Sequence, residues 1–143
     1  LVEPGTPRGF ELIRAARERL LAAGAAMVAP CPHAAACPLG PGDWCHFSQR
    51  IGRTKLQRAV KQADLGFEDE KFSYLAVSRH PAAPIAARVL RHPRVEPGKI
   101  SLELCAADGL RAEQIGKRHP GWRQARDLRW GDAIEPGDGE PGG

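Results

Sequence analysis

The feature that most limits how this chain can fold is the long loop between Pro30 and Trp44. It is built largely from Pro, Gly, Ala, Cys and His, and its apolar residues follow neither the period of a helix nor that of a strand. A loop of this length cannot order itself by burying its own apolar surface. We therefore expect a bound group or a cross-link to hold it in place.

The four cysteines of the chain are concentrated around this loop. Cys31, Cys37 and Cys45 lie in it or directly after it, whereas Cys105 ends a candidate strand much later. Cysteines of a hydrophobic core would be expected on the apolar faces of helices and strands instead. Disulfides would require an oxidising compartment, and nothing in the sequence indicates secretion. Four thiolates suit both Zn²⁺ and an iron–sulfur cluster.

The spacing of the cysteines favours a metal group larger than a single ion, although a zinc site remains an open alternative. Structural zinc sites usually contain closely spaced cysteine pairs, whereas five and seven residues separate the first three cysteines here. His33 and His46 each stand beside or near a cysteine. Either could be a ligand in a mixed zinc site. With four cysteines available, we expect both histidines to support the loop or a sulfur through hydrogen bonds.

Local patterns predict an α/β chain with a β-rich C-terminal part. Thr6 can cap a helix that begins with Pro7 and runs at helical spacing to a stop at Gly24. In the first half of the chain we also expect a buried parallel strand at Ala25–Ala29, a helix at Ser48–Ala63 with one apolar side, and a strand at Phe72–Ser78. Further along, Ala87–His92 and Lys99–Ala106 are expected to form a hairpin around the turn Glu96-Pro97-Gly98. Short strands or a helical turn are expected at Ile115–Arg118 and Trp122–Trp130.

We expect three parts along the chain: residues 1–80 with the cysteine loop, a β-rich segment 81–132 with the fourth cysteine, and a disordered acidic tail 133–143. No apolar run approaches the roughly 18 residues that a membrane span needs. We expect no secretory signal peptide, since the sequence contains no basic segment followed by an apolar run. The chain begins with Leu1 in what reads as the end of a strand, and its only methionine is Met27. We therefore expect a piece of a longer protein.

Positive charge is concentrated in two clusters. The net charge is +4, but the tail from Gly131 holds four acids and no Lys or Arg, so residues 1–130 carry +8. Such clusters suit a polyanion, because each Lys or Arg on a phosphate releases a condensed counterion. A solvated basic face is the equally good alternative. The residues that we expect to contact RNA are Arg50, Arg53, Lys55, Arg58, Lys61, Arg118, Arg123, Arg126 and Arg129.

Several strings of the sequence closely resemble one known family. They are Val28–His33, Cys37–Leu39, Asp43–Arg50 and Phe67–Tyr74. The family is that of the methyltransferase-like small-ribosomal-subunit proteins, which includes the mitochondrial small-subunit assembly factor and its bacterial relatives. The resemblance extends from Leu1 to about Ile134, and its cysteine-containing strings are long and specific.

The resemblance implies a fold, a cofactor and a partner. The fold is the C-terminal half of a class I S-adenosylmethionine methyltransferase-like, Rossmann-like α/β domain. Cys31, Cys37, Cys45 and Cys105 match the four positions that hold a [4Fe–4S] cluster in mitochondrial members. The implied partner is the rRNA of the small ribosomal subunit, in the bacterial cytoplasm or, in a eukaryote, the mitochondrial matrix. Trp122 or Trp130 could stack on a base, although core packing is the favoured role of both.

The sequence departs from the family where the methyl donor would bind. It has no Gly-rich loop after a strand. We therefore expect the half of the fold that would bind the cofactor to lie upstream, in a part of the protein that this chain lacks and that would be its partner. No catalytic residue is assigned, and S-adenosylmethionine binding is expected only in a full-length protein. Two alternatives stay open, namely an active rRNA methyltransferase and a zinc-stapled RNA-binding module. Without its other half, we expect the chain to be poorly soluble.

Overall fold

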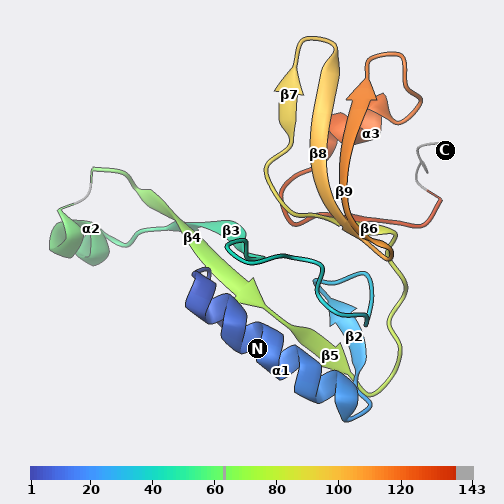
Figure 1. Cartoon of the computed structure of the whole chain (residues 1–143). Helices are drawn as coiled ribbons and strands as arrows, with labels where there is room; N and C mark the ends of the chain where they lie inside the picture. Colours follow the sequence, from blue (N-terminus) through green and yellow to red (C-terminus); the bar gives the residue numbers. More distant parts are fainter. Residues whose placement is uncertain (63, 138–143) are drawn as a thin grey trace.

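The computed structural model of the chain describes residues 1–62 and 64–137, which form three small sheets and three helices (Figure 1). In chain order the elements are β1 (Val2–Pro4), α1 (Pro7–Ala22), β2 (Ala26–Ala29), β3 (Phe47–Gly52), α2 (Lys55–Lys61), β4 (Phe67–Tyr74), β5 (Ala76–Ser78), β6 (Ala87–Val89), β7 (Arg94–Glu96), β8 (Lys99–Ala106), β9 (Gly109–Gly116), α3 (Trp122–Asp127) and β10 (Ala133–Ile134). No helix in this described part is long and apolar enough to cross a membrane.

Helix α1 begins where the sequence predicted. The hydroxyl of Thr6 accepts a hydrogen bond from the backbone N–H of Gly9 at 3.1 Å, and Pro7 occupies the first turn. Phe10 and Ile13 form the buried side of the helix. Gly9 lets α1 approach β1 closely, because a Cβ on it would lie 2.0 Å from the carbonyl oxygen of Pro4.

The strands of the N-terminal part are joined only by antiparallel pairs. Strand β4 lies between β1 and β3, and the chain continues from β4 into β5, which pairs with β2. The expectation of a buried parallel strand at Ala25–Ala29 is therefore wrong: β2 is antiparallel to β5, and Val28 is 38 % exposed. The mixed α/β character that the sequence predicted is confirmed.

The predicted helix at Ser48–Ala63 is wrong in its first half. Residues Phe47–Gly52 form β3, because the facing strand β4 offers a complete partner for them in register. The helix begins only after Thr54, whose side chain and that of Gln57 form a reciprocal capping box. This Thr-x-x-Gln signal was present in the sequence and fixes the true start of α2.

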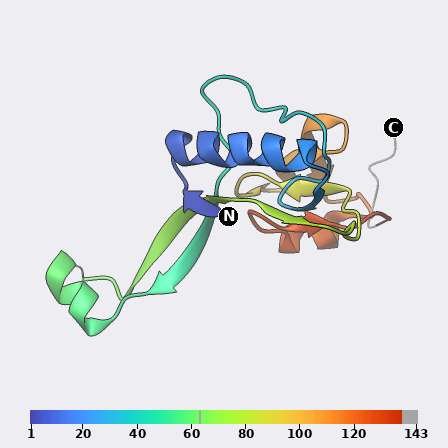
Figure 2. The ribbon, with the colours of Figure 1, turned by 90° about the horizontal axis from the view of Figure 1, so that it is seen from below.

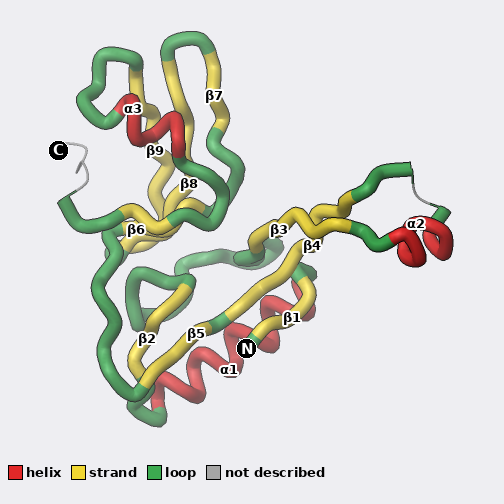
Figure 3. The backbone as a smooth tube through the Cα atoms, turned by 180° about the vertical axis from the view of Figure 1, so that it is seen from behind, coloured by secondary structure: helices red, strands yellow, loops and turns green. Residues whose placement is uncertain are grey.

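Strands β3 and β4 form an arm that carries α2 at its far end. The arm extends away from the rest of the chain in three views (Figures 1, 2 and 3). The apolar side expected to be buried lies at its tip, where Leu56 is 74 % and Val60 is 75 % exposed. The arm thus presents apolar as well as basic side chains to solvent.

A second sheet builds the C-terminal part around strand β8. Strand β9 pairs with one edge of β8, while β6 and β7 share the other edge, and β10 pairs with β6. The hairpin predicted around Glu96-Pro97-Gly98 is confirmed. Its first strand is interrupted, however, because residues 90–93 separate β6 from β7.

Of two further C-terminal expectations, one is confirmed and one needs correction. The region predicted as short strands or a helical turn at Ile115–Arg118 and Trp122–Trp130 forms the end of β9 and the short helix α3, as expected. The tail predicted to be disordered from Ala133 begins instead with β10, because Ile134 packs against the C-terminal core and its carbonyl accepts a hydrogen bond from the N–H of Ala86 at 2.7 Å. Residues 138–143 lie outside the described residues.

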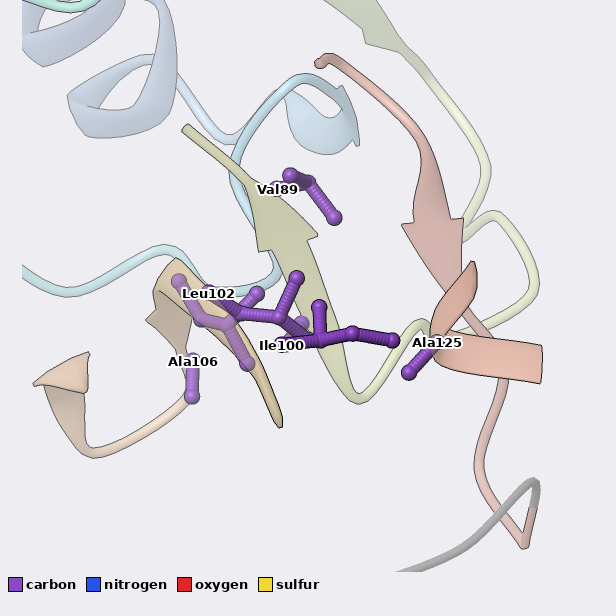
Figure 4. Packing of buried hydrophobic residues seen from close by; sticks show 7 residues of the cluster. Val89, Ile100, Leu102, Ala106 and Ala125 are labelled. Atoms are coloured by element: carbon purple, nitrogen blue, oxygen red, sulfur yellow. The ribbon is translucent and has the colours of Figure 1, made fainter. Parts of the chain in front are cut away.

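The hydrophobic core of the chain lies mainly between this sheet and α3. Ile100, Leu102 and Leu104 alternate along β8 toward one face and are at most 2 % exposed, as a half-buried strand requires. Val89 of β6 and Ala125 of α3 join them (Figure 4). This packed sheet fixes the position of Cys105 near the end of β8.

Candidate metal centre

All four cysteines line one cavity of about 40 Å³. Cys31 follows β2 directly after Pro30, Cys37 lies in the long loop, Cys45 stands two residues before β3, and Cys105 comes from β8. The rest of the wall is mostly apolar and includes Phe10, Ile13, Tyr74, Leu75 and Leu90. The fold therefore brings together, from the loop between β2 and β3 and from β8, the four thiols that the sequence singled out, and all four are free of disulfides.

The pKa values of Cys31, Cys45 and Cys105 in this cavity are raised. Burial is the main cause that raises the pKa of both Cys45 and Cys105 to about 12, and the neighbouring cysteines raise both further. Burial also raises the pKa of Cys31. Without a cation these thiols stay protonated at neutral pH, whereas a bound metal ion deprotonates the cysteines that coordinate it. The donor set thus fits a thiolate-binding metal group.

The four thiols are not already arranged as the ligands of a metal ion. Among residues 1–62 and 64–137, no group of three or more His, Cys, Asp or Glu side chains forms a ready-made metal site. The four cysteines share the wall of one small cavity instead. As a donor set, four thiols are compatible with both zinc and an iron–sulfur cluster.

Two arginines tie the cysteine loop to the body of the protein. Arg17 of α1 is 5 % exposed, and its Nη2 donates to the carbonyl oxygens of His33 at 2.9 Å and Ala35 at 2.7 Å. Arg88 of β6 donates from Nε to the carbonyl of Pro30 at 2.8 Å and from Nη1 to that of Gly131 at 2.9 Å. The loop is therefore anchored on both sides, by α1 and by the C-terminal sheet.

The two histidines near the cysteines occupy different settings. The Nε2 atom of His33 lies 3.6 Å from the sulfur of Cys105, and its buried Nδ1 has no partner in the described structure. His46 is buried in an aromatic cluster, where it stacks on Trp44 and meets Trp130 edge-on with ring centroids 5.2 and 5.0 Å apart. Of the two, only His33 is placed against a sulfur in the part of the chain that is described.

The fold neutralises part of the first basic cluster, which consists of Arg50, Arg53, Lys55, Arg58 and Lys61. The register of β3 and β4 sets Arg50 opposite Asp69, and their side chains form a two-pronged ion pair with a shortest distance of 2.8 Å. Arg53 pairs with Glu68 at 2.9 Å. Residues 50–61 contain no Asp or Glu, and the carboxylates that pair with Arg50 and Arg53 belong to the next strand, β4. Lys55 and Arg58 of α2 are exposed, and the side chain of Lys61 lies outside the described ones.

The second basic cluster surrounds α3 and keeps its charges free. Arg123 and Arg126 belong to α3, while Arg118 precedes it and Arg129 follows it. All four are exposed, and in the described ranges none has an ion-pair partner. The structure thus separates the candidate RNA-contacting residues into paired cations on the arm and free cations around α3 and on α2.

One comparison with known proteins decides the family. The sequence model described as mitochondrial small ribosomal subunit Rsm22 matches residues 1–135. The chain belongs to the Rsm22 family. No curated protein sequence matches the chain significantly. The family match confirms the resemblance to small-ribosomal-subunit proteins that the cysteine strings indicated.

In this Rsm22-family chain the matched span includes the four cysteines, both anchoring arginines and both basic clusters. Sequence reasoning missed Arg17 and Arg88 as parts of the site. A signal for Arg17 was available, since it follows Phe10 and Ile13 on the same side of α1 and is thus an arginine on a buried helix face. Arg88 carried no comparable signal, because its role depends on how β6 pairs with β8.

Proposed function

We propose that this Rsm22-family chain binds rRNA of the small ribosomal subunit and that a [4Fe–4S] cluster on Cys31, Cys37, Cys45 and Cys105 stabilises its RNA-binding form. The observation that carries the proposal is the convergence of four cysteines from distant segments on one cavity. Four thiolates are the usual ligand set of such a cluster. The cysteine spacing, which lacks the closely spaced pairs usual at structural zinc sites, favours the cluster over zinc.

The role proposed for the cluster is structural. When bound, it would supply iron–thiolate bonds that join the loop between β2 and β3 to the end of β8. Arg17 and Arg88 hold the loop from either side, and His33 lies against Cys105. Because the strands of the N-terminal part and of the C-terminal part belong to different sheets, such a link would fix their relative position.

A spectrum with metal analysis tests the cluster. The chain is purified without oxygen, and its visible absorption, iron and zinc contents are measured. A brown protein with a broad band near about 400 nm and about four irons per chain would support the cluster. A colourless protein with one zinc ion would contradict it and would leave a zinc-stapled module as the correct reading.

The proposed RNA surface consists of the free cations. Arg118, Arg123, Arg126 and Arg129 gather around α3, and Lys55 and Arg58 project from α2. Exposed, unpaired guanidinium groups can bind phosphates without first losing a protein partner. Membership of a family named for the mitochondrial small ribosomal subunit supports the proposal that the polyanion is rRNA of that subunit. The compartment that we propose is the mitochondrial matrix or, in a bacterium, the cytoplasm.

The difference between free and paired cations gives a testable prediction. The Arg123→Gln variant should bind transcribed small-subunit rRNA several-fold more weakly, and the slope of log affinity against log salt should fall by about 0.7–0.9. The Arg50→Gln variant, with the same change in net charge, should alter the slope little, because Asp69 already occupies Arg50. Filter binding across a salt series measures both. An equal effect of the two substitutions would contradict the proposed surface.

A further inference from the structure

We propose that Arg17 and Arg88 provide the counter-charge for an anionic tetrathiolate metal centre in the cysteine cavity. The inference rests on the proposed function in that it needs a metal bound by the four cysteines. It does not depend on which metal that is. It assigns a role to a buried arginine, Arg17, and a half-buried one, Arg88, which neither the sequence patterns nor the family match identifies.

The first observation is the setting of Arg17. This guanidinium lines the cavity together with the four cysteines and is 5 % exposed. It donates only to the carbonyl oxygens of His33 and Ala35, and its buried Nε has no hydrogen-bond partner in the described structure. A buried arginine that is bound to neutral groups alone is costly, because its charge is removed from water without a counter-charge.

The second observation is the setting of Arg88. It stands directly opposite Cys105 in the pairing of β6 with β8. Its hydrogen bonds also go to carbonyl oxygens, those of Pro30 and Gly131. In residues 1–62 and 64–137, neither Arg88 nor Arg17 has a carboxylate partner. Arg17 in the cavity wall and Arg88 opposite Cys105 are therefore two positive charges with no acid to balance them in the described ranges, whereas Arg14, which also lines the cavity, is exposed to solvent.

Charge balance identifies the missing partner as the loaded metal centre. Four thiolates around a dication, whether Zn²⁺ or an oxidised [4Fe–4S] core, carry a net charge of about −2. Two guanidinium groups carry the matching +2.

The inference predicts opposite effects in the loaded and the metal-free chain. In loaded protein, Arg17→Gln or Arg88→Gln removes a favourable charge, so a chelator should extract the metal faster by on the order of tenfold. If the centre is an iron–sulfur cluster, its reduction potential should also become more negative, because the reduced form carries one more negative charge. In metal-free protein, the same substitutions remove an uncompensated buried charge, so the melting temperature should stay the same or rise.

The full chain, purified without oxygen, is used for the test. The probe is the rate at which excess chelator removes the bound iron or zinc, followed by absorbance or by metal analysis. Arg19→Gln is the matched control, because it makes the same charge change on the same helix at an exposed position outside the cavity wall. Arg17→Lys and Arg88→Lys keep the charge and should retain the metal nearly as well as the unchanged chain.

Two results would overturn the inference. One is unchanged metal release in both Gln variants. The other is an equal fall of the melting temperature in loaded and metal-free protein. That result is expected if Arg17 and Arg88 only hydrogen-bond the loop carbonyls and do not balance the charge of the metal centre. Failure of the proposed cluster can be distinguished from failure of this inference. If the chain holds zinc instead of a cluster, the rates of zinc release can still be compared between the variants and the unchanged chain. A chain that retains neither metal would contradict both proposals.

Discussion

The Cys105→Ser variant, purified without oxygen, is expected to lose nearly all of its metal and any visible colour that the unchanged chain shows. Cys105 is the only one of the four cysteines that comes from the C-terminal sheet, and it is 7 % exposed in the cavity wall. Serine keeps the size of the side chain but replaces the thiolate by a poor ligand for soft metals. The loop cysteines alone cannot complete a four-thiolate site.

The loss of metal should also lower stability by several kcal/mol, since a ligand that binds only the folded state stabilises it. The unchanged chain after chelation is the control, and its thermal melting curve should coincide with that of Cys105→Ser. Iron and zinc analysis together with melting curves give the readout. Full metal content in the serine variant would show that Cys105 is not a ligand.

A second large effect is expected from Leu102→Ala, which should reduce the free energy of unfolding by about 2–5 kcal/mol. Leu102 is 2 % exposed and lies in the core between β8 and α3. A loss of this size is a large fraction of the roughly 5–15 kcal/mol that usually stabilises a domain. Urea unfolding of the full chain, followed by tryptophan fluorescence, measures it.

Leu56→Ala is the matched control for this substitution. Leu56 is 74 % exposed on α2, so its truncation should change the free energy of unfolding by less than about 0.5 kcal/mol. The pair tests the described fold directly, because the sequence pattern had assigned Leu56 to a buried helix side. Similar losses from the two substitutions would show that the arm packs against another part of the chain.

The local elements were predictable where short-range chemistry decides them. Thr6 and Pro7 set the start of α1, and the Glu96-Pro97-Gly98 turn set the hairpin, because capping and turn geometry depend on a few neighbouring residues. The set of four cysteines was also visible in the sequence as residues out of place in an irregular loop. Their convergence on one cavity was not, since it depends on contacts between distant segments.

The arm formed by β3, β4 and α2 shows why other parts of the fold could not be predicted from the sequence. Residues 48–63 contain apolar positions that also fit a helix, and only the pairing with β4 selects a strand for the first half. The same pairing brings Asp69 to Arg50 and Glu68 to Arg53. A charge count along the sequence therefore overestimated the free positive charge of this region.

The cavity joins residues that are far apart along the chain, and this has a consequence for the order of events during folding. His33 and Cys105, which touch in the native structure, are separated by 72 positions. Closing so long a segment carries a large entropic cost, and such long-range contacts form slowly. During synthesis, the loop thiols emerge well before the strand that completes their pocket. The pocket can thus close only after β8 has been made, and we expect its closure to be a late step of folding.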